Sequence, residues 1–149
     1  ISKSYGVPGL RLGILASGNE ELIGKIKVVV PIWNINSFAE FYMQIIEKYQ
    51  GDYKNALDQF REERSRMYQE LKKIQGIVVY PSQANYIMIQ LQNGQQASEL
   101  TKKLLMKYNL FIKDLTGKMK KGQYIRLAIR NETDNNKLIY ALRNEISEP

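Results

Sequence analysis

The chain opens with Ile1-Ser2-Lys3-Ser4-Tyr5-Gly6-Val7-Pro8-Gly9-Leu10-Arg11-Leu12-Gly13, and the interpretation of the rest follows from this stretch. It places a lysine and an arginine on either side of a turn that is rich in glycine and proline. Gly6, Pro8 and Gly9 allow the backbone to fold tightly and to approach a ligand closely. From these residues alone, a basic surface turn without a ligand is an equally open alternative.

The side chains beside this turn suit one kind of ligand. The amine of Lys3 can form a Schiff base with an aldehyde, and the guanidinium of Arg11 can hold a phosphate through two parallel hydrogen bonds. The hydroxyl of Ser2 adds a further phosphate donor. Because pyridoxal 5'-phosphate carries an aldehyde and a phosphate on one small molecule, the three residues predict that cofactor.

The pattern Ser-Lys-x5-Gly-Leu-Arg-x-Gly, which begins at Ser2, resembles the signature of fold-type I pyridoxal-phosphate enzymes of the class I/II aminotransferase superfamily. It resembles in particular the histidinol-phosphate aminotransferase and threonine-phosphate decarboxylase branch. The resemblance implies that Lys3 is the catalytic residue, which carries the cofactor and moves the proton at the substrate Cα. It also implies that Ser2 and Arg11 bind the cofactor phosphate.

Family members carry this lysine well past the middle of a longer chain. The resemblance therefore implies that this sequence is the C-terminal part of a larger protein. Residues 1–30 are expected to be the remnant of a large cofactor-binding domain, and residues 31–149 the small C-terminal domain. The chain by itself is expected to be inactive.

Composition narrows the classes of function. The net charge of +7 comes from 22 basic and 15 acidic residues. Such a balance can indicate binding to nucleic acid or to a membrane surface, but the lysines are scattered and the one dense run, 118–121, falls in a predicted loop, so we expect neither partner. The chain has neither cysteine nor histidine, which excludes disulfides, histidine triads and metal sites built on those ligands, and no metal is expected. The lack of cysteine fits a cytoplasmic protein, and no apolar run approaches the roughly 20 residues that cross a bilayer.

The first half of the chain is predicted to be mainly helical. The short apolar segment 11–16 is expected to form a buried strand. Ser17 and Ser37 each begin a capping-box pattern that opens a helix. Gly51 is expected to end the second helix and Asp52 to cap the third. The predicted helices span 20–28, 37–49 and 53–74, and the charged residues 61–66 form the solvated face of the third.

The second half has the order β-β-α-β-β-α. Asn93 and Gly94 mark a turn, and Asn109 suits a left-handed helix cap. The predicted strands span 77–80, 84–91, 110–113 and 124–129, and the predicted helices span 96–108 and 132–146. The expected fold class is α+β, a two-layer domain in which a mostly antiparallel sheet of three to four strands packs against helices.

The segment Pro81-Ser82-Gln83-Ala84-Asn85-Tyr86 resembles the Pro-Ser-x-Ala-Asn-aromatic motif of the histidinol-phosphate branch. In that family the strand returns towards the active site, so Asn85 is a candidate substrate-binding residue. A buried asparagine that ties backbone groups together is equally common, and both interpretations stay open.

The segment 124–135 resembles the family's terminal strand, cap and helix. Strand alternation places Arg126 and Arg130 on one face. Two arginines on a core strand are costly unless an anion meets them; an exposed edge strand is the alternative. The resemblance implies that Arg126 binds the α-carboxylate of the substrate. Arg130 replaces the glycine that is more usual in the family, and an arginine at this position resembles the decarboxylase branch. Both arginines are predicted to bind substrate.

Taken with these residues, the resemblance implies a pyridoxal-phosphate-dependent aminotransferase that acts on a small-molecule amino acid and works as a homodimer. A phospho-amino-acid decarboxylase with the same cofactor is one alternative. A basic binding domain without catalytic activity is the alternative from a different class.

Overall fold

The computed structural model describes residues 1–146, and the chain divides into two compact units, Ile1–Ala56 and Leu57–Pro149. The long helix α3 (Gln50–Lys72) contributes its first turns to one unit and the rest to the other. The two units are defined by contacts within this chain. They do not test whether residues 1–30 and 31–149 belong to two domains of a larger protein, and that assignment stays a prediction.

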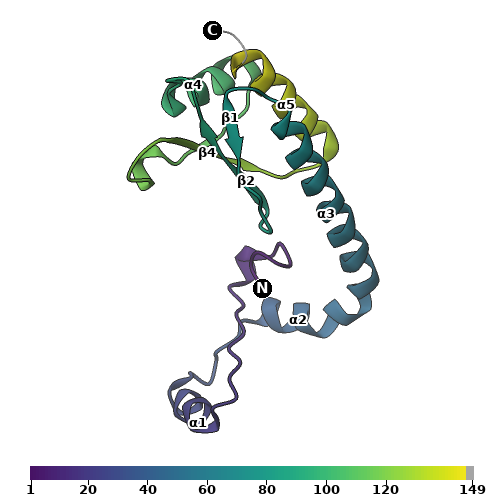
Figure 1. Ribbon diagram of the computed structural model, residues 1–149. Helices are drawn as coiled ribbons and strands as arrows, with labels where there is room; N and C mark the ends of the chain where they lie inside the picture. Colours follow the sequence, from purple (N-terminus) through teal and green to yellow (C-terminus); the bar gives the residue numbers. More distant parts are fainter. Residues whose placement is uncertain (147–149) are drawn as a thin grey trace. The chain divides into compact units, whose positions relative to one another are not determined.

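The second unit is built on a four-stranded sheet with the order β1-β2-β4-β3, in which every neighbouring pair is antiparallel. This confirms the predicted α+β class and the antiparallel sheet (Figure 1). The central pairing sets Ile89 opposite Ile125. The strands are β1 (Ile77–Val79), β2 (Tyr86–Leu91), β3 (Lys113–Asp114) and β4 (Gln123–Ala128).

Within residues 57–146, helices pack against one face of this sheet. Side chains alternate between faces along a strand, so Ile87 and Ile89 of β2 and Ile125 and Leu127 of β4 all point into the core, where none is exposed. They pack with apolar residues of α3, α4 (Ala97–Tyr108) and α5 (Glu132–Ile146). Burying a side chain of this size contributes about 1.5–3 kcal/mol. The opposite face carries more exposed residues, among them Arg126.

Local turn chemistry in this unit matches the sequence prediction. Asn93 and Gly94 adopt positive φ of 57° and 77°. Asn109 ends α4 in the left-handed conformation, where its amide bonds to the last carbonyls of the helix. Asn131 accepts a hydrogen bond from the amide of Asp134 at 2.8 Å and so caps the start of α5.

The first unit contains a 3-10 turn, Pro8–Leu10, the helices α1 (Glu20–Val29) and α2 (Ser37–Ile45), and a 3-10 turn, Ile46–Tyr49. The prediction that Ser17 and Ser37 begin the caps of these helices is wrong. The helices are capped by Asn19, which accepts from the amide of Leu22, and by Asn36, which accepts from the amide of Ala39. An asparagine directly before the first helical residue has an extended backbone and an oxygen within reach of these amides, so it is the better cap.

The predicted strand over 11–16 is also wrong. Arg11 has a φ of 52°, and Ile14 and Leu15 are 80% and 62% exposed. A strand needs a neighbour to satisfy its backbone groups, and within residues 1–146 no strand pairs with this segment. Apolar composition alone therefore does not produce a strand here.

Helix α3 begins earlier than predicted. Gly51 does not end a helix and Asp52 is not a cap, because both lie in the first turn of α3, which starts at Gln50. A glycine in a first turn interrupts little, and an acidic residue there is favoured by the positive end of the helix dipole. The helix ends at Lys72, and β3 is confined to Lys113–Asp114 instead of 110–113.

Candidate functional site

Lys3 lies in a turn that is fixed from both sides. The amide of Tyr5 donates to the carbonyl of Ile1 at 3.0 Å and closes the turn. The hydroxyl of Tyr53, at the start of α3, donates to the carbonyl of Ser4 at 3.2 Å. The rings of Tyr5 and Tyr53 stack with centroids 4.6 Å apart and planes 19° apart. The main chain around Lys3 is thus attached to α3, while the Lys3 side chain is exposed.

Arg11 follows the 3-10 turn and is held through its backbone. Its amide donates to the carbonyl of Pro8 at 3.4 Å, and its left-handed conformation ends the turn. Asn36, which caps α2, also donates from its side chain to the carbonyl of Leu10 at 3.0 Å. The exposed guanidinium itself makes one long contact, at 3.5 Å, with the carbonyl of Pro8. Most of its donors are therefore available to a ligand.

The donor set of this unit fits pyridoxal phosphate. Ser2, Lys3 and Arg11 supply a hydroxyl, a primary amine and a guanidinium within one compact unit. Neither Lys3 nor Arg11 forms an ion pair with any residue in the described part of the chain. An amine and a guanidinium that are not neutralised can meet an aldehyde and a phosphate.

Arg126 differs from every other arginine of the second unit. Its guanidinium carbon lies 5.1 Å from the ring centroid of Tyr86, and within residues 57–146 it makes no hydrogen bond or ion pair. The proposed alternative of an exposed edge strand does not apply, because β4 lies between β2 and β3. The arginines with polar partners are Arg61 with Asp58, Arg64 with Gln83, Arg66 with Glu63, Arg130 with Asp134 and Arg143 with Glu70.

A second cation lies beside Arg126 on the neighbouring strand, on the same face of the sheet. Lys113 of β3 lies directly opposite Arg126 in the antiparallel pairing, and its side chain is exposed. Directly opposite residues point to the same face, and like charges in that position destabilise a sheet. An anion bound between them would remove this cost. The sequence does not single out Lys113, because the register that brings it to Arg126 is set by strand pairing.

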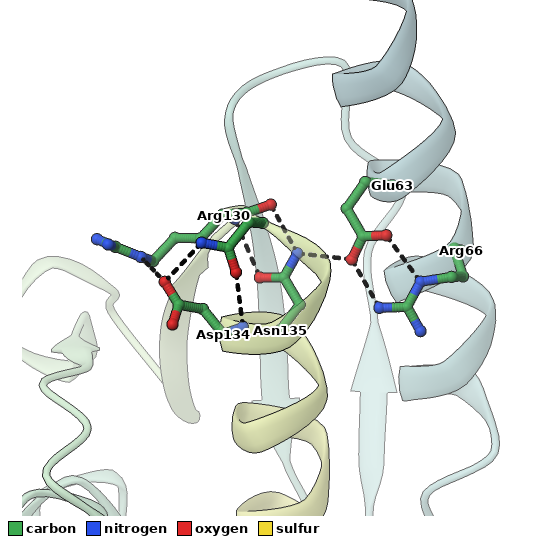
Figure 2. A network of polar contacts seen from close by, with 6 residues as sticks. Glu63, Arg66, Arg130, Asp134 and Asn135 are labelled. Atoms are coloured by element: carbon green, nitrogen blue, oxygen red, sulfur yellow. Dashed lines mark hydrogen bonds and ion pairs between the residues drawn. The ribbon is translucent and has the colours of Figure 1, made fainter. Parts of the chain in front are cut away.

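Arg130 lies beyond the end of β4 and is held separately (Figure 2). Its Nε donates to Asp134 at 2.7 Å, while the side chain stays 69% exposed. Its backbone is bound by Asn135, which accepts from the Arg130 amide at 3.0 Å and donates to the Arg130 carbonyl at 2.9 Å. Since β4 ends at Ala128, strand alternation does not determine where Arg130 points, contrary to the prediction of a shared strand face.

The charged face of α3 over 61–66 is predicted to be solvated, but Glu63 on this face is largely buried. Its carboxylate is bound by Arg66 through two hydrogen bonds of 2.7 Å and by Asn135 at 2.8 Å, and its side chain is only 14% exposed. The hydrogen bonds from Arg66 hold the pKa of Glu63 below its usual value, although burial acts in the opposite direction. These contacts connect α3 with the start of α5.

Asn85 lies where β2 begins, with an exposed side chain. Its carbonyl accepts from the amide of Ile129 at 3.1 Å, so Asn85 and Arg130 lie at the same end of the β2–β4 pair. The interpretation of Asn85 as a buried backbone tie is wrong. That structural task falls to Arg64, which donates from α3 to the carbonyl of Gln83 at 2.8 Å and to its side chain at 3.0 Å.

Ser2, Lys3 and Arg11 belong to the first unit, and Asn85, Arg126 and Arg130 to the second. In residues 1–146 no helix is long and apolar enough to cross a membrane. No cluster of acidic, histidine or cysteine side chains suited to a metal ion occurs among the same residues.

Comparison with known proteins adds a family to this geometry. Residues 1–143 match the family described as aminotransferase class I and II. The histidinol-phosphate aminotransferase of Clostridium novyi is 30% identical over 97% of this chain and 39% of its own length. The L-serine phosphate decarboxylase of Sulfurospirillum multivorans is 28% identical over 99% of this chain and 38% of its own length. The chain thus spans about two fifths of the length of these relatives.

The same similarity extends to the fold. The crystal structure of the histidinol-phosphate aminotransferase from Clostridium acetobutylicum superposes with a TM-score of 0.85 at 30% identity, over 97% of this chain and 43% of that one. The aminotransferases and related decarboxylases of this family depend on pyridoxal phosphate.

Proposed function

Because the chain belongs to the aminotransferase class I and II family, we propose that the whole protein is a pyridoxal-phosphate-dependent aminotransferase that acts on a small-molecule amino acid. The observation that carries this proposal is the state of Arg126. Its guanidinium has no polar partner in residues 57–146 and faces Lys113 across the strand pair. A pair of unneutralised cations on an open sheet face is suited to a carboxylate-bearing substrate.

Lys3, Ser2 and Arg11 are proposed to hold the cofactor, Lys3 at its aldehyde and the other two at its phosphate. When bound, pyridoxal phosphate supplies an electron sink for the charge that develops at the substrate Cα. The amine of Lys3 takes the proton from Cα and returns it as a general base and acid. Arg126 binds the α-carboxylate and thereby fixes the orientation of the substrate.

Decarboxylation of a phospho-amino acid is a second candidate, and a specific observation favours it. Lys113 adds a positive charge opposite Arg126, beyond what a single carboxylate needs. A substrate phosphate could meet this charge. The reaction would then break the bond between Cα and the carboxylate and release CO2, with a proton replacing it at Cα. The relatives include proteins named for each of these reactions.

We also propose that the whole protein is a cytoplasmic homodimer, with residues 1–30 and 31–149 in its large and small domains. For the chain by itself we also expect self-association, because it exposes large apolar side chains and exposed apolar patches favour association. They include Val28, Ile32, Trp33 and Phe38, which are 79–95% exposed. Light scattering of the whole protein tests the homodimer, light scattering of the chain by itself tests its self-association, and a monomer at high concentration would contradict either proposal. The chain by itself is proposed to be inactive.

One experiment separates the two reactions. The whole protein, loaded with pyridoxal phosphate, is incubated with L-serine, O-phospho-L-serine and a panel of other amino acids, each with and without 2-oxoglutarate as amino acceptor. An aminotransferase forms glutamate only when the acceptor is present. Release of CO2 without the acceptor would assign the decarboxylase reaction. Neither product with any amino acid would overturn both candidates and leave the non-catalytic binding domain.

A further inference from the structure

We propose that Tyr86 is a positioning residue for Arg126. The ring supports the guanidinium on the open face of the sheet and leaves its N–H donors available for the substrate carboxylate. The inference rests on the proposed role of Arg126 and deepens it, because it names how that arginine is kept ready for an anion.

The strand register brings the two side chains together. Tyr86 pairs with Ala128 and Met88 pairs with Arg126, so Tyr86 is the diagonal neighbour of Arg126 on the same face of the sheet. Aromatic and long side chains reach each other across such a diagonal. The distance of 5.1 Å from the guanidinium carbon to the ring centroid lies within the roughly 6 Å over which a cation is attracted to a ring face.

This kind of support differs from that of the neighbouring arginines. Arg66 uses two nitrogens on the carboxylate of Glu63, and Arg130 uses its Nε on Asp134. An acidic partner both occupies donors and neutralises charge. An aromatic ring attracts the guanidinium through its π face, so it orients the group without consuming a donor or adding a negative charge. Arg126 is therefore oriented, and no carboxylate of residues 57–146 forms an ion pair with it.

The ring is itself held in place by the segment before it. Arg64 donates from α3 to the carbonyls of Gln83 and Ala84 at 2.8 and 3.4 Å. The carbonyl of Asn85 then accepts from the amide of Ile129. With these bonds before it and the β2–β4 ladder after it, the Tyr86 backbone is fixed, and the ring is 38% exposed and able to lie under Arg126.

The expected effect is on binding. An arginine that is already oriented loses less side-chain entropy when it meets an anion. Replacing Tyr86 by leucine keeps apolar bulk but removes the π face, and phenylalanine keeps the face. For a contact at a partly exposed site, the loss corresponds to about a two- to fivefold weaker affinity. A matched control is Tyr140→Leu, since Tyr140 is an exposed tyrosine on α5.

The test uses the whole protein and two readouts. In 15N spectra of arginine side chains, with the Arg126 signal assigned by its loss in Arg126→Lys, the ring should shift the Nε–H resonance. That shift should vanish in Tyr86→Leu and persist in Tyr86→Phe and Tyr140→Leu. Titration with acetate, a carboxylate probe, should give a dissociation constant about two- to fivefold higher in Tyr86→Leu. The KM for a substrate should rise by a similar factor with little change in kcat, and Tyr86→Phe should restore it.

The outcomes separate this inference from the proposed function. If Arg126→Lys impairs acetate binding and turnover while Tyr86→Leu leaves the spectrum, the acetate affinity and KM unchanged, the inference alone is wrong. If Arg126→Lys changes neither acetate binding nor turnover, the role proposed for Arg126 is wrong and the inference falls with it. In a double variant with Arg126→Gln, which removes the cation, Tyr86→Leu should add no further loss, and additive losses would show that Tyr86 acts independently.

Discussion

The side-chain amide of Asn135 donates to the carboxylate of Glu63 over 2.8 Å and joins the start of α5 to the middle of α3. Asn135 is 1% exposed, and its other bonds fix the backbone of Arg130 (Figure 2). One buried amide therefore aligns two helices with the end of β4.

We expect Asn135→Ala to lower the free energy of unfolding by about 2–3 kcal/mol, because the amide and carbonyl of Arg130 lose their bonds to Asn135 and Glu63 loses one of its donors. Urea denaturation followed by circular dichroism measures the change. Asn136→Ala, at the exposed neighbouring position, is the control and should stay within about 0.5 kcal/mol of the unsubstituted chain. Equal stability of the two variants would show that the buried amide is dispensable.

Gly122→Ala is expected to destabilise the second unit. Gly122 has a φ of 88°, and an added Cβ would lie 2.7 Å from the ring of Tyr124 and 3.2 Å from the side chain of Gln90. The left-handed backbone costs a residue with a Cβ about 1–2 kcal/mol, and the ring must also move. Gly117→Ala is the control, because nothing lies within 4 Å of its Cβ position. A lower thermal midpoint for the first variant only is the expected result.

Glu145 should make stability depend on acid pH. Its side chain is 5% exposed and binds Lys107 at 2.7 Å and the hydroxyl of Tyr108 at 2.9 Å. These hydrogen bonds, that from Lys107 foremost, hold its pKa below the usual value of 4.5. A carboxyl with a lowered folded-state pKa contributes stability that is complete above the unfolded-state value and is lost as pH falls through the folded-state value.

We therefore expect Glu145→Gln to cost about 1–2 kcal/mol at pH 7, with the difference from the unsubstituted chain shrinking as the pH falls below 4.5. Urea denaturation at several pH values measures both effects. Glu62→Gln, at an exposed position on α3, is the control and should show neither. A difference that stays constant down to pH 2 would contradict a charge-based contribution.

Lys3→Ala in the whole protein is expected to abolish turnover and to leave the fold intact. The turn is closed by main-chain bonds and by Tyr53, none of which uses the Lys3 side chain. Circular dichroism tests whether the fold is intact, and an assay with the best amino-acid substrate tests whether turnover is lost. Lys27→Ala, at an exposed position of α1, should retain activity. Near-native rates for Lys3→Ala would remove Lys3 from the chemistry.

Arg126 and Arg130 are expected to have different tasks. Arg126→Lys keeps the charge but loses the planar fork that binds a carboxylate, so kcat/KM should fall on the order of tenfold for every amino acid tested. Arg130→Gly should impair mainly substrates with a second anionic group, such as O-phospho-L-serine compared with L-serine. Losses of equal size for both variants on both substrates would show that the arginines act as one unit.

The sequence predicts best where structure is decided locally. The bounds of α5 match the predicted 132–146, because Asn131 caps the helix from the adjacent position. Asn109 takes the predicted left-handed conformation for a similar local reason, because its amide bonds to carbonyls in the last turn of α4. The antiparallel sheet follows from the order of strands and helices.

The sequence predicts poorly what depends on distant partners. The segment 11–16 has the apolar composition of a strand, but no strand in the described part of the chain pairs with it. Lys113 is unremarkable in sequence until the register of β3 sets it opposite Arg126. Arg64 lies among the charged residues of the predicted solvated face, although it binds a loop nineteen residues further on. Such contacts are fixed by tertiary pairing.

The strand order has a consequence for how the second unit assembles. β1 and β2 are joined by a short connection, whereas the central β2–β4 ladder closes between Leu91 and Gln123 with all of α4 and β3 enclosed. Closing the longer loop costs more chain entropy before any contact compensates for it. High contact order of this kind slows folding. The β1–β2 hairpin and the β3–β4 pair that carries Lys113 and Arg126 can therefore each form locally, whereas the central ladder that joins them must close the longer loop.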